Sequence, residues 1–162
     1  MKKLLSLLGL KYESSSQYAK EIILEKDYKF MYENFLVSSQ RKLYLLLEKN
    51  EQSIEAITFN FHVYKYGYPN DEVDLPSKIS GVVNYGLSEV YNSNWINELK
   101  INNRSHHHHS DKMFSNRNHY IVRFKDVTLE IITGSKFSIV QIPINEFQQI
   151  INDELENISN VG

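Results

Sequence analysis

The sequence contains no cysteine, which excludes a disulfide framework and thiolate chemistry. Only 3 prolines and 6 glycines occur in 162 residues, so long flexible linkers are not expected. Positive charge is not in excess: 18 Lys and Arg stand against 20 Asp and Glu, giving a formal net charge of −2. Because nucleic-acid binders usually carry a basic surplus that neutralises phosphates, we expect no nucleic-acid partner.

Long hydrophobic runs are also missing. No stretch approaches the roughly 18 consecutive apolar residues that a membrane-spanning helix needs. The run from Leu4 to Leu10 follows two lysines as a signal peptide would, but no small-residue cleavage site comes after it. We therefore expect no membrane association and a cytoplasmic location, in agreement with the absence of cysteine.

Aromatic residues, in contrast, are abundant, with 11 Tyr, 8 Phe and 1 Trp. Tyr and Phe favour pleated, half-buried surfaces, so this composition favours β-sheet. The alternation is clearest in 57–66, where Ile57, Phe59, Phe61 and Val63 are predicted to face the core and Thr58, Asn60, His62 and Tyr64 to face outward. This pattern predicts an antiparallel strand with one buried face.

Further β-rich runs occur at 27–38, 41–50, 82–91, 119–132 and 136–144, and the run 119–132 is typical of a hairpin. Helical patterns occur at 14–27, where serines precede Tyr18, Ile22 and Ile23, and at both 93–103 and 143–158. We predict a single α+β domain, 1–162, with a mainly antiparallel sheet of about six or more strands. An N-terminal helix, a short middle helix (93–103) and a C-terminal amphipathic helix (143–158) complete it.

Five of the 6 histidines lie between Asn102 and Tyr120, and four of them are consecutive, His106–His109. Four adjacent imidazoles cannot all reach one ion from regular structure, but His106 and His109 share a face of a helical turn. Together with His119 and a carboxylate such as Asp111 or Glu130, they are candidate ligands of a divalent metal such as Zn. Two other interpretations stay open: a solvated turn that binds metal only adventitiously, and a buried hydrogen-bonding role. We assign no cofactor.

A second constellation consists of His119, Asp126 and Glu130, which a hairpin can bring together as general acid and base. These are the catalytic candidates if the protein is an enzyme. Asp126 also has an ordinary role as a turn residue. No nucleophile elbow, phosphate-binding loop, zinc-protease or dinucleotide motif occurs.

A third cluster is aromatic and acidic. It comprises Tyr64, Tyr66, Tyr68, Asp71 and Glu72, at the start of a loop rich in Pro and Gly. Tyrosines provide large contact area at low entropic cost and are enriched at protein interfaces. Neighbouring carboxylates suit a basic partner, such as a nuclease toxin that must itself hold phosphate. The alternative is a loop that packs on its own sheet.

Four motifs, YGYPNDE (66–72), YGLSEVYNSNWI (85–96), NRSHHHHSD (103–111) and HYIVRFKDVTLE (119–130), resemble a family of small Gram-positive bacterial proteins with no assigned activity. The likeness covers about residues 41–132. It implies special positions at His106, His109, His119, Asp126, Thr128 and Glu130, and makes His107 and His108 incidental. Many relatives have His-Pro where this chain has Leu75 and Pro76. Such proteins look like those of toxin–immunity loci, including orphan immunity genes.

The sequence thus leaves two classes of function. We expect a protein-binding module, such as an immunity protein that neutralises a toxin domain, rather than an enzyme. The alternative is a metal-dependent hydrolase or nuclease-like enzyme that uses His106, His109, His119 and Glu130. Nothing in the sequence determines the oligomeric state.

Overall fold

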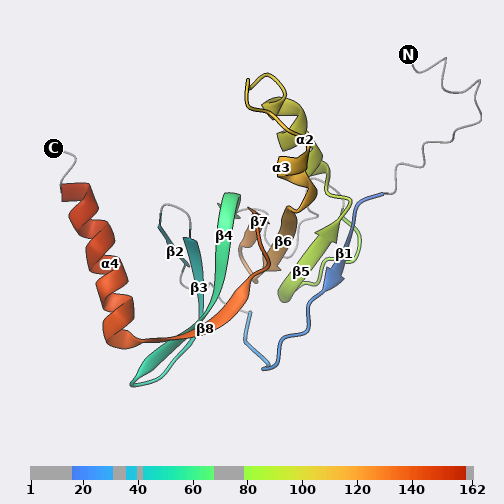
Figure 1. Ribbon diagram of the computed structural model, residues 1–162. Helices are drawn as coiled ribbons and strands as arrows, with labels where there is room; N and C mark the ends of the chain where they lie inside the picture. Colours follow the sequence, from blue (N-terminus) through green and yellow to red (C-terminus); the bar gives the residue numbers. More distant parts are fainter. Residues whose placement is uncertain (1–15, 31–35, 40–41, 68–78, 160–162) are drawn as a thin grey trace, which may run out of the picture.

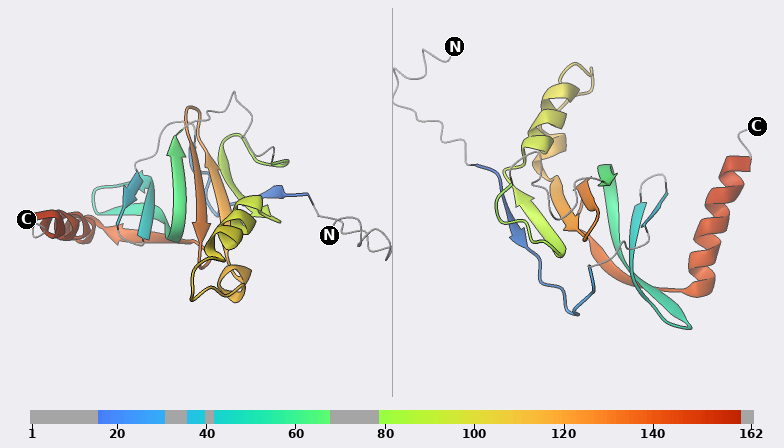
Figure 2. Two further views of the ribbon diagram at one scale, coloured as in Figure 1. Left: turned by 90° about the horizontal axis from the view of Figure 1, so that it is seen from above. Right: turned by 180° about the vertical axis from the view of Figure 1, so that it is seen from behind.

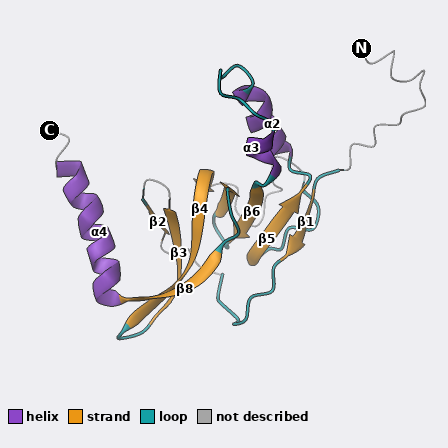
Figure 3. Cartoon of the chain, in the orientation of Figure 1, coloured by secondary structure: helices purple, strands orange, loops and turns teal. Residues whose placement is uncertain are grey.

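The computed structural model describes residues 16–30, 36–39, 42–67 and 79–159, and shows a mainly antiparallel α+β protein (Figure 1; Figure 3). In chain order its elements are β1 (Tyr18–Glu21), β2 (Leu36–Ser38), β3 (Lys42–Lys49), β4 (Ser53–Gly67), β5 (Gly86–Tyr91), α2 (Asn94–Asn103), α3 (Lys112–Ser115), β6 (Asn118–Arg123), β7 (Thr128–Thr133), β8 (Ser138–Pro143) and α4 (Ile144–Ser159). No helix among the described residues is long and apolar enough to cross a membrane.

The eight strands form one sheet in the order β1-β5-β6-β7-β4-β3-β2, and β8 also pairs with β4. The long strand β4 divides the sheet into two halves. Its first part pairs with β3 and β8, and its second part pairs with β7. We call these the β3–β8 half and the β5–β7 half. A bulge between Phe61 and Val63 marks the change from one half to the other.

The main core lies where the inner faces of the two halves meet. Leu43, Leu45, Ile57 and Phe59 from the β3–β8 half pack with Leu87, Tyr120, Val122, Leu129 and Ile131 from the β5–β7 half. At roughly 25 cal/mol per Å² of apolar area removed from water, such burial is the dominant favourable contribution to folding.

Two smaller clusters cover the outer faces. Phe147 and Ile151 of α4 pack with Tyr44, Ile54 and Ile142 on the β3–β8 half. On the β5–β7 half, Ile79 packs with Ala19, Val90 and Ile121. Figures 1 and 2 show α4 and the α2–α3 pair at opposite ends of the molecule.

The sequence predicted helices at 93–103 and 143–158. The structure has α2 at Asn94–Asn103 and α4 at Ile144–Ser159. The predicted N-terminal helix is wrong in its described part, because Tyr18–Glu21 forms β1 and pairs antiparallel with β5. An apolar spacing of four residues, as between Tyr18 and Ile22, fits a strand as well as a helix. The open edge of β5 decides the outcome by supplying a backbone partner.

The bulge in β4 corrects a second prediction. Phe61 and Tyr64 were predicted on opposite faces of the strand, yet both pack against the main core, with ring centroids 5.1 Å apart. An extra residue at a bulge reverses the alternation beyond it. Lys65 therefore points to the outer face of the β5–β7 half, where it lies beside Glu130.

Candidate functional site

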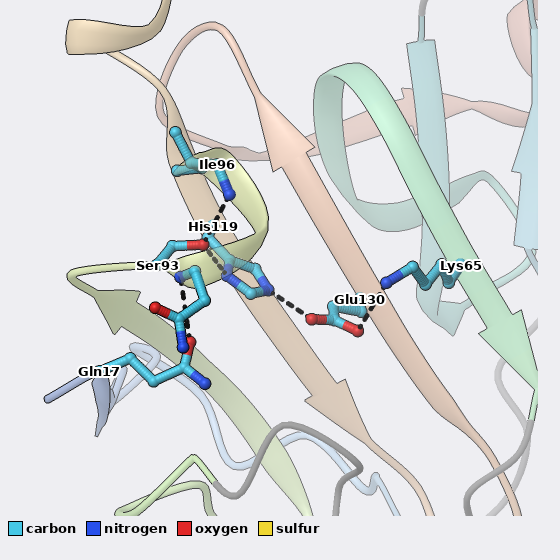
Figure 4. Close-up of polar contacts among 7 residues, drawn as sticks. Gln17, Lys65, Ser93, Ile96, His119 and Glu130 are labelled. Carbon is cyan, nitrogen blue, oxygen red and sulfur yellow. Dashed lines mark hydrogen bonds and ion pairs between the residues drawn. The ribbon is translucent and has the colours of Figure 1, made fainter. Parts of the chain in front are cut away.

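His119, at the start of β6, is the centre of a buried polar network on the outer face of the β5–β7 half (Figure 4). The residue is only 1% exposed, yet both ring nitrogens have polar neighbours. Nδ1 lies 2.8 Å from Oγ of Ser93, and Nε2 lies 2.9 Å from Oε1 of Glu130. A serine hydroxyl and a carboxylate thus flank the imidazole on opposite sides.

Ser93 is the N-cap of α2, and this role determines the direction of its bond to His119. Its Oγ accepts the backbone N–H of Ile96 at 3.1 Å, as expected of a serine that caps a helix. The hydroxyl proton is then available for Nδ1 of His119. A proton on Nε2 faces the Glu130 carboxylate, which leaves Nδ1 to accept from the Ser93 hydroxyl.

Glu130, on β7, closes the other side of the network. The Nε2 proton does not point straight at Oε1, so the contact is mainly electrostatic rather than a well-aligned hydrogen bond. Nζ of Lys65 lies 3.8 Å from Oε2. Burial alone would raise the pKa of Glu130, but the contacts with His119 and Lys65 outweigh it and hold that pKa below its ordinary value.

Trp95 covers the network from the first turn of α2. Its ring meets the imidazole of His119 edge-on, with centroids 5.6 Å apart and planes at 74°. The ammonium of Lys65 lies 3.7 Å from the indole centroid, so it contacts both an aromatic face and a carboxylate. Gln17 accepts the backbone N–H of Asn94 at 3.1 Å, which ties the segment before β1 to the same helix end.

The order Ser93–His119–Glu130 resembles the order of groups in a serine hydrolase, but the environment favours a structural role. Ser93 is buried, and its oxygen is already engaged by Ile96 and His119. A nucleophile needs an exposed oxygen within reach of substrate. The network is well built to fix the start of α2 onto the sheet.

The consecutive histidines lie apart from His119. His106, His107 and His108 are exposed in a turn after α2, with their rings packed on one another, and His106 Nδ1 accepts the backbone N–H of His108. His109 is half-buried, 3.0 Å from Asn103 Oδ1 and 2.8 Å from Asp111 Oδ1. Within the described ranges, no group of three or more His, Cys, Asp or Glu side chains is placed to hold a metal ion.

The two other candidate clusters are only partly assembled. His119 meets Glu130, whereas Asp126 is exposed in the β6–β7 turn, at the far end of the hairpin. Tyr64 is half-buried against Phe61, and Tyr66 is 41% exposed near the end of β4. Tyr68, Asp71 and Glu72 lie outside the described residues, as do Leu75 and Pro76.

The sequence predicted that His119 and Glu130 meet, and the structure brings them together. Ser93, Lys65 and Trp95 carried no signal in the sequence that linked them to the histidine. Comparison with known protein families, with curated proteins and with solved structures finds nothing that matches this chain. The resemblance carried by the four motifs therefore stays a prediction.

Proposed function

We propose that the protein is a protein-binding module, such as an immunity protein that occludes the active site of a toxin. The observation that carries the proposal is a stacked pair of tyrosines at one edge of the sheet, the partly exposed Tyr18 of β1 and the exposed Tyr91 of β5. Immobilised aromatic side chains are the usual anchors of protein interfaces, because little conformational freedom remains to be lost on binding.

We call this surface the tyrosine ribbon; it comprises Tyr18, Lys20, Glu89 and Tyr91. Tyr18 and Tyr91 face each other across the two strands and stack with centroids 5.2 Å apart and planes at 14°. The ammonium of Lys20 lies 5.3 Å from the Tyr91 centroid and 5.8 Å from that of Tyr18. The Tyr91 hydroxyl donates to Glu89 at 2.9 Å, and Tyr91 is nevertheless 37% exposed.

Tyr66 belongs to a second contact region, the one predicted from the sequence together with Tyr68, Asp71 and Glu72. Its exposure near the end of β4 supports this assignment, whereas Tyr64 packs inward and has a structural role. Catalysis receives less support, because Ser93 and His119 are buried and the Ser93 oxygen already accepts the backbone N–H of Ile96.

The test is purification from the native host through a C-terminal tag without histidines, followed by mass spectrometry. We expect one stoichiometric partner, most tellingly the C-terminal domain of a toxin encoded nearby, and inhibition of that toxin by the purified chain. A preparation without any partner, or a partner whose activity is unchanged in the complex, contradicts the proposal.

Substitutions then locate the surface. Replacing both Tyr18 and Tyr91 by alanine should weaken the complex by at least about 30-fold, since an interface anchor contributes about 2 kcal/mol or more. The matched control is Ile101→Ala, because Ile101 is 56% exposed on α2, away from the ribbon. Equal affinity of the double variant and the control removes the tyrosine ribbon from the interface.

A further inference from the structure

Strand β8 has a backbone edge that is unpaired within the described part of the chain. It pairs with β4 along Ser138–Pro143, and no other described strand lies on its second side. In an antiparallel pair, alternate residues direct their N–H and C=O groups away from the partner strand, so half of the backbone groups of β8 face outward.

The edge also lacks the features with which proteins usually protect exposed strands. Its sequence, SIVQIP, has no charged residue, and its pairing with β4 contains no bulge. Natural edge strands are commonly shielded by lysines, by bulges or by a covering element. Pro143 is at the very end of the strand, where it leaves the earlier residues free to pair.

A groove of about 500 Å³ runs beside this edge, within the size range of about 300–1,000 Å³ of known ligand sites. One wall is formed by Phe137–Gln141 and the other by Ile22–Lys26, an irregular segment that follows β1 and bends at Glu25–Lys26 (Figure 1). No hydrogen bond joins Ile22–Lys26 to Ser138–Gln141 across it. Ile23, on the rim, is 89% exposed.

We infer that this groove binds an extended segment of the partner protein, which adds to β8 as a further antiparallel or parallel strand. The inference rests on the proposed protein-binding function and specifies the form in which the partner is bound. Strand addition supplies affinity through main-chain hydrogen bonds and specificity through alternate side chains.

The geometry selects a single extended chain rather than a second copy of this protein. The β8 edge lies at the side of a groove whose opposite wall is the segment Ile22–Lys26. A second copy would have to bring its own segment Ile22–Lys26 to the same groove of about 500 Å³, so a single extended chain is the better fit.

The lining of the groove indicates the chemistry of the bound segment. Ile22, Leu24 and Ile139 are half-buried and pack against the main core, so they present apolar surface to alternate side chains. The charged lining residues are Glu25, Lys26 and Glu55, and Lys26 already pairs with Glu55 at 2.6 Å. Glu25 acts on the same ammonium, so two carboxylates share one lysine and the lining carries an excess of one negative charge, which favours a segment with apolar residues and a lysine or arginine.

The test uses a phage-displayed library of random linear peptides, selected on the full-length chain. Enriched peptides are synthesised and their affinities measured by fluorescence anisotropy. We expect alternating apolar residues with at least one basic residue. Two N-methylated versions of each peptide are then compared, one methylated at the odd-numbered backbone nitrogens and one at the even-numbered ones. One version should bind at least tenfold more weakly and the other nearly unchanged, because only one of the two sets of amides bonds to β8.

The variant protein is Ile23→Lys combined with Gln141→Lys, two exposed positions in the walls of the groove. It should bind the peptides at least tenfold more weakly than the wild type, and the control Ile101→Lys should bind normally. Circular dichroism verifies that both variants are folded. Absence of enriched peptides, insensitivity to backbone methylation, or equal binding by the double variant overturns the inference.

Two other occupants would overturn it as well. A concentration-dependent dimer that dissociates in the double variant would identify a second copy, and displacement of the peptides by a synthetic peptide of residues 1–15 would identify the chain's own N-terminus. A natural partner that binds the double variant unchanged refutes the groove and leaves the proposed function standing. Peptide binding at the groove with no natural partner refutes the proposed function instead.

Discussion

Replacing Ser93 by alanine removes one oxygen that serves two partners. That oxygen accepts the backbone N–H of Ile96 at 3.1 Å and lies 2.8 Å from Nδ1 of His119. Loss of an N-cap hydroxyl costs about 1 kcal/mol. A buried acceptor left without a donor costs a further 1–3 kcal/mol or so, and Nδ1 belongs to a residue that is 1% exposed. We therefore expect the variant to be less stable by about 2–4 kcal/mol.

Urea unfolding followed by tryptophan fluorescence measures this change directly. Trp95 is the sole tryptophan and lies 5.6 Å from the imidazole of His119, so its emission reports on the network itself. In a domain of this size a loss of about 2–4 kcal/mol corresponds to a melting temperature lower by roughly 4–16 °C. The denaturant dependence should stay unchanged, because the surface exposed on unfolding is the same.

Ser93→Gly separates the two contributions. Glycine is nearly as good as serine at an N-cap, so its cost there is a few tenths of a kcal/mol, whereas His119 loses its partner in both variants. Most of the destabilisation should therefore persist in the glycine variant. Combining Ser93→Ala with His119→Phe should cost less than the sum of the single changes, because both remove the same contact. An alanine variant within about 0.5 kcal/mol of the wild type would refute the reasoning.

Two further predictions concern other parts of the sheet. The folded-state pKa of Glu130 is lowered, so its contribution to stability is present above the unfolded-state pKa of about 4.3 and is lost as pH falls through the folded-state value. Glu130→Gln should therefore lose less stability than the wild type between pH 6 and pH 3, as measured by urea unfolding. An equal loss in the two proteins would contradict this. Gly81 has φ +83° and a Cβ there would collide with the backbone oxygen of Ala19, whereas a Cβ at Gly67, with φ +130°, meets nothing within 4 Å. Gly67→Ala should therefore cost about 1–2 kcal/mol from backbone strain alone, and Gly81→Ala clearly more; calorimetry that ranks them in the opposite order would show that the contact with Ala19 yields easily.

The sequence was most informative where local pattern and global packing agree. Ile57 and Phe59 alternate with polar residues and face the main core, and the run 119–132 forms the β6–β7 hairpin with Asp126 in its turn. Helix α2 is preceded by Ser93, a residue type that commonly caps helix N-termini. These features depend on neighbours within a few residues, and such neighbours are visible in a sequence.

The remaining features depend on contacts distant in the chain. The bulge after Phe61 is fixed by pairing with β7, about 70 residues later, so strict alternation misplaced Tyr64. Ser93 and His119 are 26 residues apart, and nothing in their spacing predicts a hydrogen bond. The segment after Ser16 forms a strand because the edge of β5 is available to pair with it. The spacing of apolar residues in the segment contains no information about that edge.

The length of β4 also has a mechanical consequence. Its 15 residues span roughly 50 Å at the usual rise of a strand, and it is bonded near one end to β8 and near the other to β7. Lys65, near the second end, lies against Trp95 at the start of α2. A pulling force on a segment bound at the β8 edge would therefore be transmitted along the backbone of β4 to the start of α2, which His119 holds on the sheet. Strand β4 thus connects the two ends of the molecule mechanically.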